Sequence, residues 1–478
     1  MADFRLSVLT PAQVALLRAV AAVAPRTAKP ALVGGAIRDA RLRRPVVDVD
    51  VAVAGGALAV AARVATRVGG SVIPLDAGRG VARVVAEGHR VDLADFRAPT
   101  LEGDLAARDF TVDALAVPLR ALLTDGHAPI VDPTGGLRDL RDRRLRVPSA
   151  GALIDDPLRA LRGVRLAVAL GLRIVPATAR AIRAVAPRVA DVSAERARDE
   201  LLAMLALPAA ERALRLADRL GLLTVVLPEV EPMRRTRQPA PHRFDVLEHS
   251  LRAVGGADRV VARIGALAPF GEELASHVRE PIAGGVDRGQ ALKLAALLHD
   301  VSKPETRRAV GGRVRFFEHD LRGAARVIEI GERWRLPERV TAVVERLVRH
   351  HLRPMHLGAA GEITPRARYR FYRDLGQETR DLVLLALVDG AAVRGQSPFV
   401  VWPHAGLLRD LLAGWTETRE TVSAPPLLRG DDVMARYGLA PGPEVGRRLA
   451  RVREAQDLGL VRTRAEALAF LDSSDGDS

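Results

Sequence analysis

The sequence predicts an α+β protein in which a mixed β-sheet head precedes an all-helical remainder. Alternation of apolar and polar residues, the pattern of half-buried strands, is confined to residues 1–145. From about residue 153 the apolar residues recur at spacings of three and four, as in Leu158, Leu161, Leu166 and Leu170. Aromatic residues are only 3% of the chain, so we expect aliphatic cores.

The chain has 478 residues, which predicts three or four domains at about 100–200 residues each. We expect a head over residues 1–145, a helical neck and body over 146–232, a larger helical domain over 233–415 and a helical tail over 416–478. The Pro- and Arg-rich stretch 228–241 spans this domain boundary, and a further helical block follows it to about residue 415. Pro425 and Pro426 mark the boundary before the tail.

Five strands and one long helix are expected in the head. The strands are predicted at residues 32–33, 46–53, 71–75, 81–85 and 90–93, with a helix over 58–68.

Composition limits the kind of protein and its partners. The chain carries 72 Lys and Arg against 58 Asp and Glu, a net charge of +14, which favours a polyanion such as nucleic acid. Only three of these residues are Lys, and Asn is absent, so a compositional bias accounts for part of the charge. With no Cys, metals must be held by His and carboxylates. No apolar run reaches about 18 residues, so we expect a cytoplasmic protein without a membrane partner.

Two carboxylates lie two residues apart in the predicted strand 46–53. Side chains alternate along a strand, so Asp48 and Asp50 should project from one face. Paired carboxylates suit Mg²⁺, which completes its coordination with substrate phosphates and can support phosphoryl or nucleotidyl transfer. An isolated pair of aspartates of this kind more often lies on a half-exposed edge strand and is simply solvated. The neighbouring residues must therefore decide between a metal site and a solvated strand.

A glycine turn lies just upstream of these aspartates. Gly34 and Gly35 follow the predicted strand 32–33 and precede a helical stretch. Backbone N–H groups at such a turn favour phosphate, and Arg38 can add a forked donor. Alone, the pair of glycines is equally consistent with a tight turn.

Five ordered motifs resemble one family. GGAIRD (34–39) with DVD (48–50), RDFTVDA (108–114), DPTGGLRDL (132–140), DDPLRALR (155–162) and SAERARDEL (193–201) are similar to motifs of the bacterial tRNA nucleotidyltransferase and poly(A) polymerase family. The resemblance implies a polymerase-β-like nucleotidyltransferase head that holds Mg²⁺ through Asp48 and Asp50. It further implies CCA addition to the 3′ end of tRNA from CTP and ATP.

Base selection is expected from the fourth motif. On one helix, Asp156 and Arg159 would be neighbours, and Arg162 would continue the row. An arbitrary pair of this kind is usually a surface ion pair of little consequence. The resemblance implies instead that Asp156 and Arg159 select CTP and ATP, while Arg108 and Arg162 help to hold the nucleotide.

Three positions leave questions open. The usual Glu of the fourth motif is Asp155, and the usual Asn of the second is Asp113, which exchanges an amide donor for an acceptor. Asp92 is either a third carboxylate near the metals or a solvated strand residue.

A second ligand set occurs in the helical domain. His249, the adjacent His299 and Asp300, and Asp389 provide nitrogen and oxygen ligands for a divalent metal. The set resembles an HD domain, which implies a phosphohydrolase fold that either hydrolyses phosphoesters, such as a cyclic phosphate end of RNA, or binds metal without turnover. Further candidate ligands for a second ion are His319, His350 and His351.

Several functions remain to be compared. The preferred function is CCA addition, because nothing between residues 70 and 100 resembles the basic segment of the tailing relatives. An A-adding enzyme or poly(A) polymerase of the same family is the alternative. A metal-dependent phosphohydrolase with a nucleotide-binding head belongs to another class, and a purely structural RNA-binding protein would leave both ligand sets idle.

Overall fold

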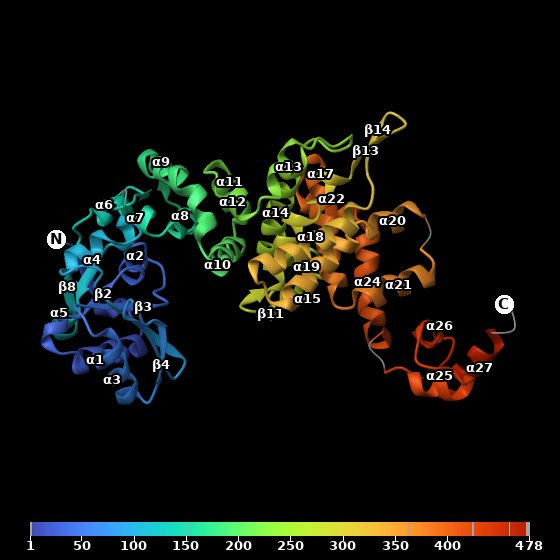
Figure 1. Ribbon diagram of the computed structural model, residues 1–478, viewed down its shortest axis with the longest axis horizontal. Helices are drawn as coiled ribbons and strands as arrows, with labels where there is room; N and C mark the ends of the chain where they lie inside the picture. The colour runs from blue at the N-terminus through green and yellow to red at the C-terminus, as the bar shows by residue number, and fades with distance from the viewer. Residues whose placement is uncertain (1, 150, 362, 423–424, 458, 475–478) are drawn as a thin grey trace. The chain divides into compact units, whose positions relative to one another are not determined.

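A computed structural model describes residues 2–149, 151–361, 363–422, 425–457 and 459–474 (Figure 1). Contacts divide the chain into two compact units, Met1–Glu200 with Leu216–Val226, and Leu201–Arg215 with Leu227–Ser478. The mixed sheet lies in the first unit, and the second is mainly helical, so the predicted α+β class is confirmed. The four-domain division stays a prediction.

A six-stranded sheet forms the centre of the head, in the order β4-β5-β6-β3-β2-β7. Strands β3 and β6 are parallel, and the other neighbours are antiparallel. The strands are β2 (Ala31–Val33), β3 (Val49–Val53), β4 (Ser71–Asp76), β5 (Val81–Ala86), β6 (His89–Asp95) and β7 (Ala116–Pro118).

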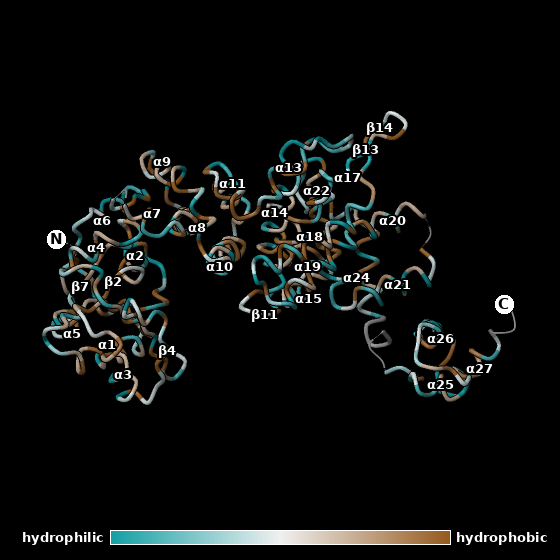
Figure 2. Tube along the Cα trace, in the orientation of Figure 1, coloured by the Kyte–Doolittle hydropathy of each residue, from teal (hydrophilic) through white to brown (hydrophobic). Residues whose placement is uncertain are grey.

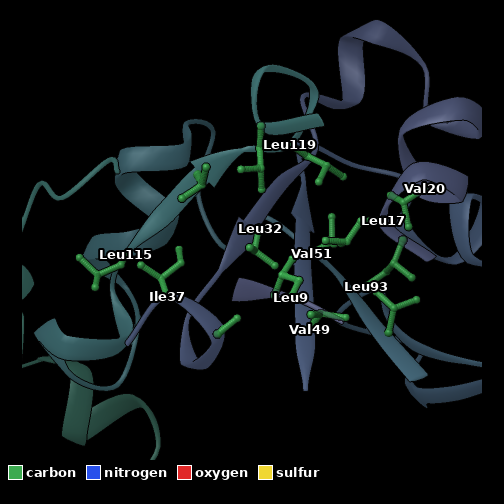
Figure 3. Packing of buried hydrophobic residues seen from close by; sticks show 14 of the residues in the cluster. Leu9, Leu17, Val20, Leu32, Ile37, Val49, Val51, Leu93, Leu115 and Leu119 are labelled. Atoms are coloured by element: carbon green, nitrogen blue, oxygen red, sulfur yellow. The ribbon is translucent and has the colours of Figure 1, made fainter. Parts of the chain in front are cut away.

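One face of this sheet carries the main core of the head. Alternate residues such as Leu32, Val51 and Leu93 are fully buried there, and Figure 3 shows them with Leu17 of α1. The largely hydrophobic α1 (Pro11–Val23) and α3 (Ala57–Val68) cover this face (Figure 2). Further head elements are β1 (Asp3–Arg5), α2 (Gly35–Arg41), α4 (Leu101–Ala106), α5 (Leu119–Asp125), β8 (His127–Pro129) and α6 (Gly136–Arg141).

The strand that carries the predicted carboxylates is shorter than expected. Strand β3 begins at Val49, so Asp48 lies just before it, and the predicted start at residue 46 is wrong. The side-chain amide of Gln13 donates hydrogen bonds to the carbonyl oxygens of Val46 and Val47, at 2.9 and 3.2 Å. These carbonyls therefore pair with α1 and not with a neighbouring strand.

The neck is helical, as predicted, apart from a short parallel strand pair. Leu158, Leu161, Leu166 and Leu170 are all buried along α8, which confirms their helical spacing. The elements are β9 (Arg144–Leu145), α7 (Gly151–Asp155), α8 (Leu158–Leu170), β10 (Arg173–Ile174), α9 (Pro176–Val185), α10 (Ala194–Leu205), α11 (Ala210–Arg219) and α12 (Leu223–Val226).

The second unit is built around a bundle in which α16 contacts α14, α19 and α22. Its helices are α13 (Val230–Arg235), α14 (Val246–Ala262), α15 (Gly271–His277), α16 (Arg288–Leu298), α17 (Lys303–Thr306), α18 (His319–Trp334), α19 (Glu338–His350), α20 (Arg353–Ala359), α21 (Pro365–Leu375), α22 (Glu378–Arg394), α23 (Pro398–Val401) and α24 (Gly406–Val422). The short α13 lies inside the stretch predicted as a boundary.

Two hairpins interrupt this otherwise helical region. They pair β11 (Pro281–Ala283) with β12 (Val286–Asp287), and β13 (Arg307–Val310) with β14 (Arg313–Phe316). The second turns at Gly311 and Gly312, whose φ angles of 57° and 70° suit a two-residue turn. In Figure 1 this hairpin extends away from the neighbouring helices.

The tail has its own small apolar core. Val433, Val452 and Leu471 are buried within α25 (Gly430–Tyr437), α26 (Pro443–Asp457) and α27 (Arg464–Ser474). Helix α24 runs through the predicted boundary at residue 416.

No single helix among the described residues is long and apolar enough to cross a membrane. By length and composition alone, one bent pair, Glu378–Arg394 with Pro398–His404, passes the test together, with an angle of 101° between its parts.

Candidate active sites

The head has a carboxylate pair in adjacent strands. Asp50 of β3 lies opposite Asp92 of β6 in the parallel register, so both side chains project from the same face of the sheet. Burial, followed by the negative charge of Asp92, raises the pKa of Asp50 to about 6. A bound cation would relieve this crowding of negative charge, so the residues present fit a divalent metal.

Arginines already contact two of the carboxylates. Asp48 is half-exposed and accepts hydrogen bonds from Arg90, with the closest atoms 2.7 Å apart. Asp92 is held by two hydrogen bonds from Arg83, both 2.8 Å long. Asp92 is therefore neither simply solvated nor free to bind a metal while Arg83 keeps this position.

The glycine turn closes one side of the carboxylate pair. Gly34 has a φ of 72°, a backbone conformation that favours glycine. A Cβ atom at this position would lie 3.3 Å from a guanidinium nitrogen of Arg108 and 3.9 Å from a carboxylate oxygen of Asp50. A side chain here would therefore crowd Arg108.

A cavity of about 350 Å³ joins the predicted head residues. It is lined by Gly34, Gly35, Arg38, Asp48, Asp50, Arg108 and Arg162, together with Asp109 and Asp113. Cationic side chains and carboxylates thus meet in one hollow of the size of a small ligand site. The predicted neighbourhood of the glycine turn and the aspartates is present in the structure.

The unusual Asp113 has a defined partner. Its carboxylate accepts a 2.6 Å hydrogen bond from Arg38, whose guanidinium also binds Asp39 at 2.9 and 3.0 Å. Burial raises the pKa of Asp113, while Arg38 opposes that shift. The acceptor that replaces the usual amide therefore fixes the orientation of Arg38.

The predicted base-selecting pair is not a pair on one helix. Pro157 separates α7 from α8, so Asp156 lies before α8, and its Oδ1 accepts a hydrogen bond from the N–H of Leu158 at 3.2 Å. Asp156 also binds Arg196 at 2.7 Å. The predicted helical row is therefore wrong for Asp156.

Arg159 is buried and is held by other partners. It binds Asp109 at 2.7 Å and donates to the carbonyl oxygens of Ala107 and Ala152. Neither Asp156 nor Arg159 lines the cavity that holds the aspartates. The neighbouring Asp155 is exposed.

Two cavity arginines were not anticipated from the sequence. Arg165 binds Glu200 at 2.7 Å, whereas the guanidinium of Arg97 has no ion pair or hydrogen bond with any described residue. Burial, followed by the charge of Arg108, lowers the pKa of Arg97. Arg97 follows the end of β6, where no periodic pattern marks it.

The second unit brings predicted HD ligands together from three helices. His249 on α14, His299 after α16 and Asp389 on α22 have ligand atoms that all lie within 4.8 Å of one another. Nε2 of His249 lies 2.9 Å from Asp389 and 3.2 Å from Nε2 of His299. Burial lowers the pKa of His299, but the charges of Asp300 and Asp389 outweigh burial and raise this pKa to about 10. The cluster therefore favours a positive charge.

Asp300 belongs to a neighbouring cluster with His319 and His351. His350 belongs to neither cluster, so of the candidate ligands His350 and His351 only His351 lies beside other potential metal ligands. His242 was not anticipated; its ring lies 5.4 Å from that of His249, and it lines a cavity of about 640 Å³ together with Asp300, His319 and His351. Only its position in the fold identifies it, because it directly follows the Pro- and Arg-rich stretch 228–241 and belongs to no motif.

Family models match three parts of the chain. Residues 31–146 match the poly A polymerase head domain, residues 171–234 the probable RNA and SrmB-binding site of polymerase A, and residues 246–389 the HD domain.

Full-length relatives decide the family. The chain is 38% identical over 456 residues to the A-adding tRNA nucleotidyltransferase of Deinococcus radiodurans, covering 92% of this chain and 94% of the relative. The chain belongs to the tRNA nucleotidyltransferase family. It is also 36% identical over 448 residues to the CC-adding tRNA nucleotidyltransferase of Thermus thermophilus, with 92% of each chain covered.

Solved structures have the same fold as this tRNA nucleotidyltransferase. A complex of a CCA-adding enzyme with ATP has a TM-score of 0.64 at 18% identity and 99% coverage of both chains. The Thermotoga maritima CCA-adding enzyme complexed with tRNA has a TM-score of 0.59 at 19% identity, again with 99% coverage of both chains. The predicted family and enzyme class are confirmed, which disfavours a solely hydrolytic or structural protein. Nucleotidyltransferase and HD domains generally use divalent metals.

Proposed function

We propose that this chain adds CCA to the 3′ end of tRNA, using CTP and ATP without a nucleic-acid template. The observation that carries the proposal is the head cavity of about 350 Å³, which Asp48 and Asp50 line together with Arg38, Arg108 and Arg162. Carboxylates suit a divalent cation, and arginines suit a triphosphate. The relatives' names, which specify CC or A addition to tRNA, support this substrate.

Asp48 and Asp50 would hold Mg²⁺ in this proposal. Their fit rests on the crowded carboxylates and on the raised pKa of Asp50. When bound, the cation supplies charge neutralisation and lowers the pKa of the attacking hydroxyl.

The protein's own residues position the reactants. Arg38, fixed by Asp39 and Asp113, and Arg108 would bind the triphosphate beside the glycine turn. The 3′-hydroxyl oxygen of the RNA attacks the α-phosphorus, the bond to the bridging oxygen breaks, and pyrophosphate leaves. Positioning and charge stabilisation account for the rate in such transfers.

Asp156 and Arg159 remain the proposed base-selecting residues, on the strength of the family resemblance. Their present partners, Arg196 and Asp109, occupy the groups that would read a base. Base reading by these side chains therefore requires both ion pairs to open, and Arg196→Ala should change the preference between CTP and ATP if Asp156 reads the base.

An A-adding enzyme is the second candidate, because the Deinococcus relative at 38% identity carries that name. The deciding experiment supplies tRNAs that end at the discriminator base, after one C, and after two, with labelled CTP and ATP separately and together. Extension of all three to CCA supports the proposal. Extension only after two C residues establishes A addition, and long A tracts establish tailing. A tRNA substrate also supports the predicted cytoplasmic location.

We also propose that His249, His299, Asp300 and Asp389 bind a divalent metal that supports phosphoester hydrolysis. The carrying observation is the convergence of buried His249 and His299 on Asp389. Hydrolysis of RNA ending in a 2′,3′-cyclic phosphate, compared with His299→Ala, tests this activity. Metal binding without hydrolysis by the wild-type chain would establish a scaffold.

A further inference from the structure

The β13–β14 hairpin carries positive charge and no negative charge. Four of its ten residues, 307–316, are arginine, and none is aspartate or glutamate. Over the whole chain 72 basic residues stand against 58 acidic ones, so the compositional bias alone does not explain a hairpin without any acid. Because the hairpin extends away from the neighbouring helices (Figure 1), its charge is open to a partner.

Three of these arginines lie on one face of the hairpin. Arg308 is directly opposite Arg315, and Val310 is directly opposite Arg313. Opposed residues share a face, as do residues two apart on one strand, so the Cβ atoms of this group lie about 5–7 Å apart. Like charges directly opposite each other are destabilising, and a polyanion lying across this face would relieve the repulsion.

The chain supplies no carboxylate to this face within its described residues. Arg308 donates to two backbone carbonyl oxygens, at 3.0 and 3.2 Å, and Arg313 and Arg315 form neither a hydrogen bond nor an ion pair there. The neighbouring Glu305 instead binds Arg326 of α18 at 3.3 Å. The three guanidinium groups are therefore available to an anion that does not belong to the described chain.

An exposed aromatic ring directly follows β14. The side chain of Phe317 is 50% exposed. The adjacent Phe316 is already engaged, with His319 at a ring separation of 6.5 Å and with the ammonium of Lys303 at 5.6 Å. Phe317 makes no ring contact in the described part of the chain, and it lines the same hollow as Arg315. A free guanidinium and a free aromatic ring thus lie together.

We propose that the β13–β14 hairpin and Phe317 form a binding surface for an unpaired RNA segment. The three arginines of the shared face bind its phosphates, and Phe317 stacks on a base. Arginines that neutralise phosphates release counterions, and an aromatic ring stacks on bases of any sequence. The surface lies outside residues 171–234, which match the probable RNA-binding model, so it is an additional contact. The choice of RNA as the polyanion rests on the proposed function.

Other roles for this hairpin fit its residues less well. Charges that only keep free strand edges from pairing can have either sign and need no exposed ring beside them. An RNA duplex offers phosphates but keeps its bases stacked, which would leave Phe317 unused. A lipid surface requires a broader apolar face than Val310 and Phe317 provide.

The affinity of the full chain for single-stranded RNA tests the arginines. The probe is a fluorescently labelled oligoadenylate of about twelve nucleotides, followed by anisotropy at several salt concentrations without nucleoside triphosphates. Arg308→Ser with Arg313→Ser and Arg315→Ser should weaken binding about tenfold at low salt. The slope of log affinity against log salt should fall by about 2, because each phosphate contact to a single strand contributes about 0.7.

A matched control removes the same charge elsewhere in the second unit. Arg259→Ser with Arg279→Ser and Arg339→Ser also replaces three exposed arginines. This variant should change the affinity for oligoadenylate less than twofold. Circular dichroism confirms that both triple variants are folded.

The aromatic contact has a different signature. Phe317→Ala should weaken oligoadenylate binding about fivefold or more while leaving the salt slope unchanged, because stacking releases no counterions. Leu321→Ala, which shortens a similarly exposed apolar side chain on α18, should change the affinity less than twofold. An RNA duplex of the same length should bind wild type and Phe317→Ala equally.

The arginine assignment is overturned if the triple hairpin variant binds oligoadenylate as the wild type does, or if the control variant loses as much. Wild-type affinity in Phe317→Ala, or an equal loss for the duplex, overturns the assignment to an unpaired strand. If the triple hairpin variant instead loses binding to phosphatidylserine vesicles and keeps its affinity for RNA, the partner is a lipid surface and the proposal is wrong.

Nucleotide addition to tRNA, measured on the same proteins, separates this inference from the proposed function. A chain that adds CCA but binds oligoadenylate independently of the hairpin overturns the inference alone. Hairpin-dependent binding by a wild-type chain that adds no nucleotide overturns the proposed function and leaves the RNA-binding surface standing.

Discussion

The carboxylates of the head cavity and of the HD centre differ in how deeply they are buried. In the head, Asp48 and Asp92 are bound by Arg90 and Arg83, and Asp48 is half-exposed. In the HD centre, Asp300 and the surrounding histidines are buried; Oδ2 of Asp300 accepts a 2.6 Å hydrogen bond from Lys303, whereas its Oδ1 has no hydrogen-bond partner among the described residues. Under the proposed function, a cation at the half-exposed head carboxylates would exchange readily and could arrive with the nucleotide. A cation at the HD centre would instead occupy a buried, preformed site.

The largest expected effect is a loss of nucleotide incorporation that leaves the HD centre unchanged. Asp50→Asn should reduce nucleotide incorporation by about 10³-fold or more, because the removed carboxylate would hold the cation that stabilises the transferring phosphate. The metal content of the HD centre should not change. Single-turnover incorporation of labelled CTP and ATP measures the loss, with Asp76→Asn on β4 as an exposed control. Wild-type turnover in Asp50→Asn would remove this residue from the mechanism.

Metal removal should lower the stability of the protein through the HD centre, whereas the Asp50→Asn substitution should act on activity in the head. Binding to the native state contributes about 3–4 kcal/mol at 100–1,000 times the dissociation constant, so chelation should lower the melting temperature of the wild type by several degrees. His299→Ala should show no chelator-dependent shift, yet retain nucleotide incorporation within about twofold. Differential scanning calorimetry with and without chelator provides the measurement, and His350→Ala should behave as the wild type does.

Arg97 tests whether an arginine without an ion pair contributes to nucleotide binding in the head cavity. Arg97→Ala should raise the KM for CTP and ATP about tenfold, because its guanidinium has no partner among the described residues and faces the cavity of the proposed triphosphate. Steady-state kinetics provide the values. Arg79→Ala, which removes an exposed arginine from the turn between β4 and β5, should leave KM unchanged; equal effects would indicate a general charge contribution.

The smallest effect concerns the ion pair at Asp48. Arg90→Ala should change the free energy of unfolding by no more than about 0.5 kcal/mol, because both partners are about half-exposed. It should lower the Mg²⁺ concentration for half-maximal activity about two- to threefold by releasing Asp48. A magnesium titration tests this expectation, and a higher Mg²⁺ requirement would show that Arg90 positions Asp48 for the metal.

Local patterns allowed much of the fold to be predicted. Alternation located five of the six strands of the sheet but not the short β7, and three- and four-residue spacing located α8 with its buried leucines. Gly311 and Gly312 lie between short runs of alternating residues, a pattern that predicts a hairpin even within this otherwise helical region. The error at Asp156 was avoidable too, because Pro157 disfavours a continuous helix.

Other parts of the sites depend on long-range contacts. Arg97 follows a strand without any distinguishing spacing, and His351 differs from His350 only in where the end of α19 places it. The start of β3 depends on Gln13, more than thirty residues away in the sequence. Such features require the packed structure.

The Gln13 amide has a consequence for experiments at the N-terminus. By engaging Val46 and Val47, it sets where the peptide ahead of Asp48 leaves α1 and enters the sheet. A truncation that deletes α1 would therefore disturb a carboxylate that it does not contain. Loss of polymerisation in such a shortened protein would report a misplaced backbone segment, and assigning substrate contacts to the deleted helix on that basis would be an error.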